Sequence, residues 1–333
     1  MERENSKRYA GLDVLRILFC YGIVIYHIND VFQSAPSRYF PFLCRYGGYL
    51  GNYFFFMASG FLMACRQKDR ISEEHLPHFL WARLRKIYPI YLFSTLSILI
   101  LGGTEITVGR ILSSVFLVST GWLDGDTMPL NFPAWFLCIL VICELWYFAI
   151  GKLSARFPRL YLPLCGFFAV WGAALQIMNW EIPLNYRTCG EGYLNFFLGV
   201  LLAELFVKAP FPRRGHLVTG GSALLAALLL GGSLVCADRA PAAVPWLISP
   251  FCAFLLYAAV HLRLPALPAW IPPDLPGQFT MLIFLWHIPL VWDFLFLQTK
   301  SPLAGIPPEW SFPLYLLILS VFMLIFCIGS RDS

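Results

Sequence analysis

The stretch LDVLRILFCYGIVIYH, residues 12–27, is apolar enough to begin a membrane span, yet it carries Asp13, Arg16 and His27. Ionisable groups inside a membrane helix are costly, so they normally face a partner or a working site. Arg16 and His27 are eleven residues apart, which on a helix is about three turns plus 20°, or about 16 Å along the axis. Both side chains therefore project from nearly one face. Asp13 precedes Arg16 by three residues and can pair with it, which lowers the cost of burying the guanidinium.

The rest of the chain is equally apolar. Of its 333 residues, 59% are hydrophobic and only 13% are charged, against about a quarter charged in soluble domains. Apolar runs recur from end to end without a long polar segment. We therefore expect one all-α integral-membrane domain, residues 1–333, in contact with the lipid bilayer. The basic residues are spread over short loops, which argues against a nucleic-acid partner.

Ten apolar runs can form membrane spans, since about 20 residues are needed to cross. An eleventh run, 109–121, has 13 residues and is too short to count with them. The predicted fold is thus a bundle of about ten transmembrane helices, at residues 10–28, 47–65, 87–102, 133–151, 160–178, 191–207, 217–236, 244–262, 277–298 and 311–328.

The distribution of basic residues orients this bundle. With ten spans and the N-terminus inside, the cytoplasmic segments hold 17 Lys and Arg and the outer loops hold 6. Counting 109–121 as a span changes the split to 12 against 11, which removes the asymmetry that normally orients such proteins. We therefore predict a multi-pass protein of the inner, cytoplasmic membrane with both termini in the cytoplasm. Residues 103–132 then form a long outer connection, of a length that is more often functional than idle.

The ten cysteines lie mostly inside apolar runs. None belongs to a C-x-x-C motif or to a zinc-like cluster with histidine. We expect them to be small packing residues, and we expect no metal site.

Two further features extend the pattern of the first span. The segment WARLRKIYP, residues 81–89, places Arg83, Arg85 and Lys86 at the cytoplasmic end of the third run. Such a cluster suits a polyanionic ligand, but an ordinary positive-inside cluster explains it equally. His287 lies about ten residues into the ninth run. A histidine at that depth marks either a packed polar contact or a working site.

Together these pieces resemble the acyltransferase-3 family of bacterial membrane O-acyltransferases. Asp13, Arg16 and His27 match the family's opening Leu-Asp-x-Leu-Arg followed by ten residues and a histidine. Residues 55–61, FFMASGF, are similar to its Phe-Phe-x-x-Ser-Gly-Phe. Residues 83–89, RLRKIYP, resemble its Arg-x-x-Arg-Ile-Tyr-Pro, and residues 284–287, FLWH, resemble its late Tyr-Leu-x-His. The four motifs occur in the family's order over almost the whole chain.

The sequence departs from the family pattern at two positions. Lys86 stands where the family has a second arginine, and a lysine cannot make a planar bidentate contact with phosphate, so Arg85 takes part of that role. Glu144 resembles the glutamate of the family's Glu-x-x-Phe-Tyr, but it follows Trp135 by nine residues instead of a shorter gap. The chain is also expected to lack the extracytoplasmic domain that some members append.

The resemblance implies transfer of an acyl group, commonly acetyl, from cytoplasmic acyl-CoA to a hydroxyl of a cell-envelope glycan or lipid-linked sugar. His27 would be the general base or would briefly accept the acyl unit. Asp13 would orient Arg16, while Ser59 and His287 would polarise the carbonyl or position the acceptor. The residues expected to bind acyl-CoA are Arg16, Arg83, Arg85, Lys86 and Tyr88.

Two rival functions remain open at this point. A polar groove among ten spans is also what an exporter or permease of a glycan or small solute has, although neither inverted repeats nor paired helix breaks are evident. A catalytically silent sensor or scaffold would keep the spans without needing the Arg16–His27 register. The acceptor, the acyl chain and the oligomeric state are not encoded in a readable pattern.

Overall fold

The computed structural model describes residues 9–67, 70–101, 106–122, 127–208, 215–262, 272, 274–300 and 305–329. Within them the fold is all helical, as expected. The elements are α1 (Ala10–Ile28), η1 (Pro36–Arg38), α2 (Pro41–Gln67), α3 (Leu76–Leu101), α4 (Val108–Val115), η2 (Phe132–Ala134), α5 (Trp135–Arg156), η3 (Pro158–Leu160), α6 (Tyr161–Met178), α7 (Arg187–Lys208), α8 (Gly215–Arg239), η4 (Pro241–Ala243), α9 (Val244–His261), α10 (Leu275–Lys300) and α11 (Pro308–Gly329).

Seven helical segments of the described chain are long and apolar enough to cross a membrane. They are α1, α8 and α10, α5 together with η2, α6 with η3, α9 with η4, and α11. The chain is therefore a multi-pass membrane protein. The other long described helices, α2, α3 and α7, coincide with three of the runs found in the sequence. That these three also cross, which would make ten spans, stays a prediction.

The third helix begins earlier than the sequence suggests. Its apolar run starts at residue 87, but α3 begins at Leu76 and continues through Pro89. Hydropathy detects only the apolar part of a helix, so the polar first turns escaped it. Arg83, Arg85 and Lys86 consequently lie on the helix itself.

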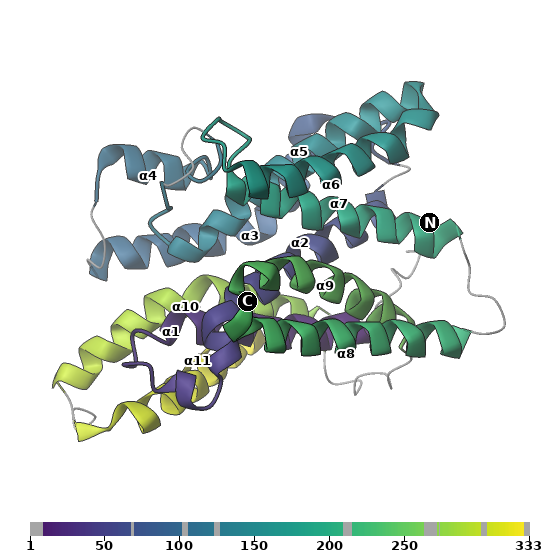
Figure 1. Ribbon diagram of the computed structural model, residues 1–333. Coiled ribbons are helices and arrows are strands. Elements are labelled where there is room, and N and C mark those ends of the chain that lie inside the picture. Colours follow the sequence, from purple (N-terminus) through teal and green to yellow (C-terminus); the bar gives the residue numbers. More distant parts are fainter. Residues whose placement is uncertain are drawn as a thin grey trace.

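Figure 1 shows α2 between two groups of helices, α3 to α7 on one side and α1 with α8 to α11 on the other. Helix α2 packs against α1, α7 and α9. Three of its polar side chains, Tyr46, Asn52 and Tyr53, are buried. The central helix thus directs these three polar side chains into the protein.

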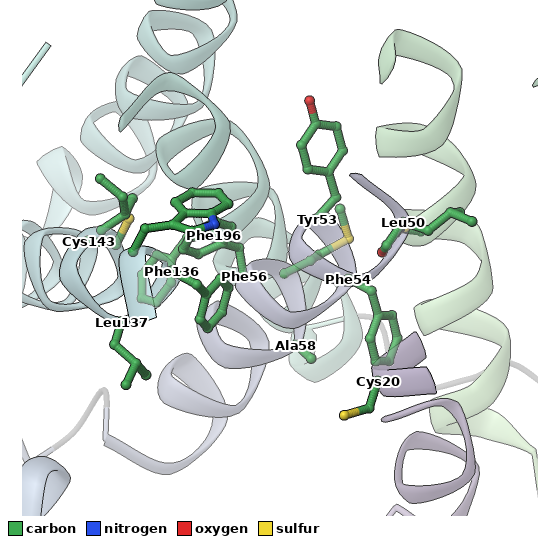
Figure 2. Packing of buried hydrophobic residues seen from close by; sticks show 14 of the residues in the cluster. Cys20, Leu50, Tyr53, Phe54, Phe56, Ala58, Phe136, Leu137, Cys143 and Phe196 are labelled. Atoms are coloured by element: carbon green, nitrogen blue, oxygen red, sulfur yellow. Dashed lines mark hydrogen bonds between the residues drawn. The ribbon is translucent and has the colours of Figure 1, made fainter. Parts of the chain in front are cut away.

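Glycines allow α2 and α7 to cross at close range. A Cβ atom on Gly60 would lie 2.0 Å from the carbonyl oxygen of Phe196, and one on Gly199 would lie 2.0 Å from that of Met57. Small residues at such crossings let membrane helices pack backbone to backbone. Figure 2 shows Phe56 beside Phe136 next to this crossing, with ring centroids 4.2 Å apart.

Side-chain contacts group the connections into two ends of the bundle. The Lys152 ammonium donates to the Ser72 carbonyl over 3.0 Å, which joins the connection after α2 to the end of α5. We call this the inner end. At the other, outer end Arg38 pairs with Glu309 at 2.6 Å. Residues 72 and 152 lie at the same end, so the chain between them must cross the membrane an even number of times. On the predicted topology helices α3 and α5 account for two crossings, and α4, with eight residues and a length of only about 12 Å, is too short to add a third.

None of the ten cysteines, all of which lie in described segments, forms a disulfide, and seven of them are buried. For these seven the expectation that they are packing residues is confirmed.

The close crossing of α2 and α7 predicts that the protein is destabilised by a larger residue at Gly60. Gly60→Ala should lower the stability of the protein in detergent by about 1–3 kcal/mol, because the new methyl group overlaps a backbone oxygen. Gly166→Ala is the matched control, since a Cβ at Gly166 meets nothing within 4 Å. Thermal unfolding followed by size-exclusion chromatography measures both. Equal melting temperatures for the two variants would contradict the crossing.

The orientation is tested with single cysteines in a variant that lacks the native ten. Ala155→Cys at the inner end should resist a membrane-impermeant maleimide in intact cells, because we predict a cytoplasmic position. Glu181→Cys, in the connection between α6 and α7, should react. Both native residues are exposed on the protein, so a difference in labelling reports the side of the membrane. The reverse pattern would invert the topology.

Candidate active site

Two membrane histidines that the sequence analysis identified separately lie side by side. His27 is in the last turn of α1 and His287 is in the middle of α10. Their ring centroids are 5.4 Å apart and the rings are tilted by 32°. The Cys20 thiol donates to the Thr280 carbonyl over 3.3 Å, which helps to hold α1 against α10. The fold thus brings together two imidazoles that are 260 residues apart in the chain.

The hydrogen bonds of His287 determine its tautomer. Its Nδ1 lies 3.1 Å from the Ile283 carbonyl oxygen and 2.9 Å from that of Phe284. Carbonyl oxygens only accept, so Nδ1 carries the proton and Nε2 has the lone pair in the neutral ring. The side chain is fully buried, and Nε2 has no partner in the described residues. An unpaired basic nitrogen in the interior favours a working site over a packed polar contact.

The side chain of His27 is half-buried, and two aromatic rings pack against its imidazole. Phe132, the first residue of η2, packs edge-on against it with a centroid distance of 5.2 Å, and Tyr26 does so at 5.0 Å. The pair of histidines is therefore framed by α1, α10 and the segment that precedes α5. That segment ends the long connection, residues 103–132, whose length is more often functional than idle.

Two residues that the sequence analysis missed hold the backbone of α10 around His287. The Asn131 amide donates to the Leu285 carbonyl over 2.9 Å, and the Tyr315 hydroxyl donates to the carbonyl of His287 itself. Both side chains are buried. Neither belongs to a recognisable motif, because their partners are backbone atoms that a sequence pattern does not specify.

Side chains on one face of α3 hold the end of α4 and the segment that precedes α5. The hydroxyls of Tyr88 and Tyr91 donate to the carbonyls of Val115 and Ser114 over 2.6 and 2.8 Å. One further turn along, Ser94 accepts from Asn131 over 2.8 Å. Tyr88, proposed from the sequence as a ligand of acyl-CoA, therefore has its hydroxyl engaged by the protein.

The predicted ion pair at the start of α1 is confirmed. Arg16 and Asp13 approach to 3.6 Å, and the Arg16 side chain is 23% exposed. Arg66, at the end of α2, is close enough to Arg16 for the two positive charges to interact. The sequence analysis did not single out Arg66, because α2 brings it back to the level of Arg16 only in the folded bundle.

Arg83 points into the protein beside a small cavity of about 70 Å³ between α3 and α5. Its guanidinium lies over the Phe79 ring at 4.9 Å. The carboxylate of Glu144 lines the same cavity and its charge acts on Arg83. Glu144, which fitted the family pattern imperfectly, therefore has a cationic neighbour. The other lining residues are Leu84, Ile87, Tyr88, Tyr91, Leu117, Leu137, Leu140 and Val141.

The remaining predicted residues lie apart from the histidines. Arg85 and Lys86 are exposed on the early turns of α3, at the inner end. Ser59 is half-buried on α2, and within the described residues no hydrogen bond joins it to His27 or His287. The structure thus pairs the two histidines and leaves the roles of these three residues as predictions.

Comparison with known proteins gives one match. The family model described as an acyltransferase domain, that of the acyltransferase-3 family, matches residues 9–331, nearly the whole chain. No curated protein and no solved structure matches significantly. Since the family match covers all four motifs and the helices are those of a multi-pass membrane protein, the chain belongs to the acyltransferase-3 family and is a membrane acyltransferase.

Proposed function

We propose that the protein transfers an acyl group, most simply acetyl, from cytoplasmic acyl-CoA to a hydroxyl of a cell-envelope glycan or lipid-linked sugar at the inner membrane. The observation that carries this proposal is the pair His27–His287, in which a basic Nε2 is buried without a protein partner next to a second imidazole. Transfer between an alcohol and a thioester needs such a group, because the hydroxyl must lose its proton as it attacks.

The imidazoles of the site can take up and return the proton that moves during acyl transfer. The acceptor oxygen attacks the thioester carbonyl carbon, a C–O bond forms and the C–S bond breaks. The hydroxyl proton passes to an imidazole and then to the leaving thiolate of CoA. His27 acts as that base, or it accepts the acyl group first and passes it on. His287 lies close enough to orient the acceptor or to share the proton.

The phosphates of CoA are assigned to cations at the inner end. Arg85 and Lys86 are exposed there, and Arg16 has Arg66 nearby. The rise of α1 separates Arg16 from His27 by about 16 Å, a distance that the extended pantetheine arm can bridge. Arg83 and Glu144 line the same cavity. The Glu144 carboxylate would therefore compete with a CoA phosphate for the Arg83 guanidinium. Asp13 orients Arg16, and Ser59 remains a candidate for positioning the acceptor.

The chemistry predicts that His27→Ala loses transfer activity. We expect a decrease of about 10²–10⁴-fold in turnover with normal expression and insertion, because alanine cannot move a proton or carry an acyl group. Radiolabelled acetyl-CoA and purified protein in lipid provide the assay, with His75→Ala, an exposed histidine outside the site, as the control. Turnover near that of the wild type would remove His27 from the mechanism.

The assignment of the phosphates predicts an effect on the donor alone. Replacing Arg85 and Lys86 with Gln should weaken acyl-CoA binding by about ten- to a hundredfold, because charge-assisted phosphate contacts are lost. The apparent KM of the acceptor should change little. Lys86→Arg should bind at least as well as the wild type, since a guanidinium contacts phosphate in bidentate fashion.

Calorimetric titration with acetyl-CoA measures this effect, and Arg159→Gln is the control, because Arg159 is an exposed arginine near the same end. A wild type that binds no acyl-CoA but moves a glycan or solute across reconstituted vesicles would establish the exporter instead.

A further inference from the structure

Helix α10 contains a break in its hydrogen bonding two residues before its histidine. In an α-helix the carbonyl of residue 285 accepts from the N–H of residue 289. Residue 289 is Pro289, which lies inside α10 and has no N–H to donate. The carbonyl oxygen of Leu285 therefore lacks the regular i+4 donor of its own helix. In an apolar bundle an unpaired carbonyl is costly.

Asn131 supplies the missing donor. Its Nδ2 lies 2.9 Å from the Leu285 carbonyl oxygen and 2.8 Å from the Ser94 hydroxyl oxygen on α3. An amide has two N–H groups, so these two bonds use both of them. The side chain is fully buried. Asn131 thus joins α3 to the one carbonyl of α10 that Pro289 frees.

The neighbours of these atoms are the catalytic candidates. His287 follows Leu285 by two residues, and its own carbonyl accepts from Tyr315. Phe132, the residue after Asn131, packs against the ring of His27. A shift of Asn131 would therefore move both imidazoles relative to each other. The Oδ1 atom of Asn131 has no partner in the described residues, so these two donated bonds are the hydrogen bonds that hold the amide.

We propose that Asn131 is a positioning residue, which caps the carbonyl freed by Pro289 and so fixes His287 against His27. This inference rests on the proposed function for its effect on catalysis. Misplacement of a catalytic group by about 1 Å can cost about a hundredfold in rate. The expected signature is a lower kcat with an unchanged KM for acyl-CoA, because the CoA-binding cations lie on other helices.

A double-mutant cycle tests the pairing of Asn131 with Pro289. Asn131→Ala should lower kcat about ten- to a hundredfold. Pro289→Ala restores an N–H that can donate to the Leu285 carbonyl, so this variant alone should retain activity. In the double variant the helix supplies its own donor, and most of the lost kcat should return. Additive effects of the two substitutions would overturn the proposal.

Two matched variants separate this role from general stability. Pro250→Ala removes another proline from the interior of a helix, α9, and should not rescue Asn131→Ala. Ser94→Ala removes the bond to α3 but leaves the bond to Leu285, so it should lower kcat much less than Asn131→Ala does, and Pro289→Ala should not rescue that small loss. If Asn131→Ala does not fold, Asn131→Leu fills the space without an N–H and enters the same cycle. Rescue by Pro250→Ala would contradict a specific cap.

A spectroscopic readout keeps the proposal testable even if no acyl transfer is found. The chain has six histidines, and ¹⁵N-histidine labelling with His287→Gln for assignment isolates the ring signals of His287. Asn131→Ala should shift them, and adding Pro289→Ala should return them toward the wild-type values. An inactive wild type with this shift and return would refute only the proposed function. Unshifted signals in Asn131→Ala would refute the positioning role.

Discussion

A polar group inside this bundle has to find its partner within the protein, because the surrounding hydrocarbon offers none. The backbone of α10 illustrates the constraint, since Pro289 frees a carbonyl that a side chain from a distant segment then covers. The tyrosines on α3 act in the same way on the carbonyls at the end of α4. The connection between α3 and α5 is therefore held in place by hydrogen bonds, and it brings Phe132 to His27. The geometry of the site follows from satisfying these few atoms.

The imidazole of His287 is one of several buried side chains in the described residues that keep an atom without a hydrogen-bond partner. Its Nδ1 is satisfied twice over by carbonyls of its own helix, while its Nε2 is left without a protein partner in the described chain. A buried basic nitrogen that has no hydrogen-bond partner costs free energy. On the proposed function, the acceptor hydroxyl offsets that cost during each turnover. On that proposal, the site favours ligands that donate a hydrogen bond to Nε2.

Much of the fold could be predicted from the sequence, because hydropathy and family motifs are local. The helical runs, the pair Asp13–Arg16 and the packing role of the cysteines were all correct. The start of α3 was not, since its first turns are polar. The family pattern indicated that His27 and His287 both take part in the reaction. It did not indicate that the two side chains are in contact, because that depends on how α1 packs against α10. Asn131 and Tyr315 could not be found, because each donates to a backbone atom that has no sequence signature.

The central position of α2 has a consequence for how the protein is made. Helix α2 is not among the seven described segments that are long and apolar enough to cross a membrane, and it carries Tyr46, Asn52 and Tyr53 on its buried surface. The helices that cover this surface include α7 and α9, which leave the ribosome much later. During synthesis α2 therefore lacks these covering helices until residues 187–208 and 244–261 have been made. Chain elongation, as well as sequence, sets the order in which this bundle can close.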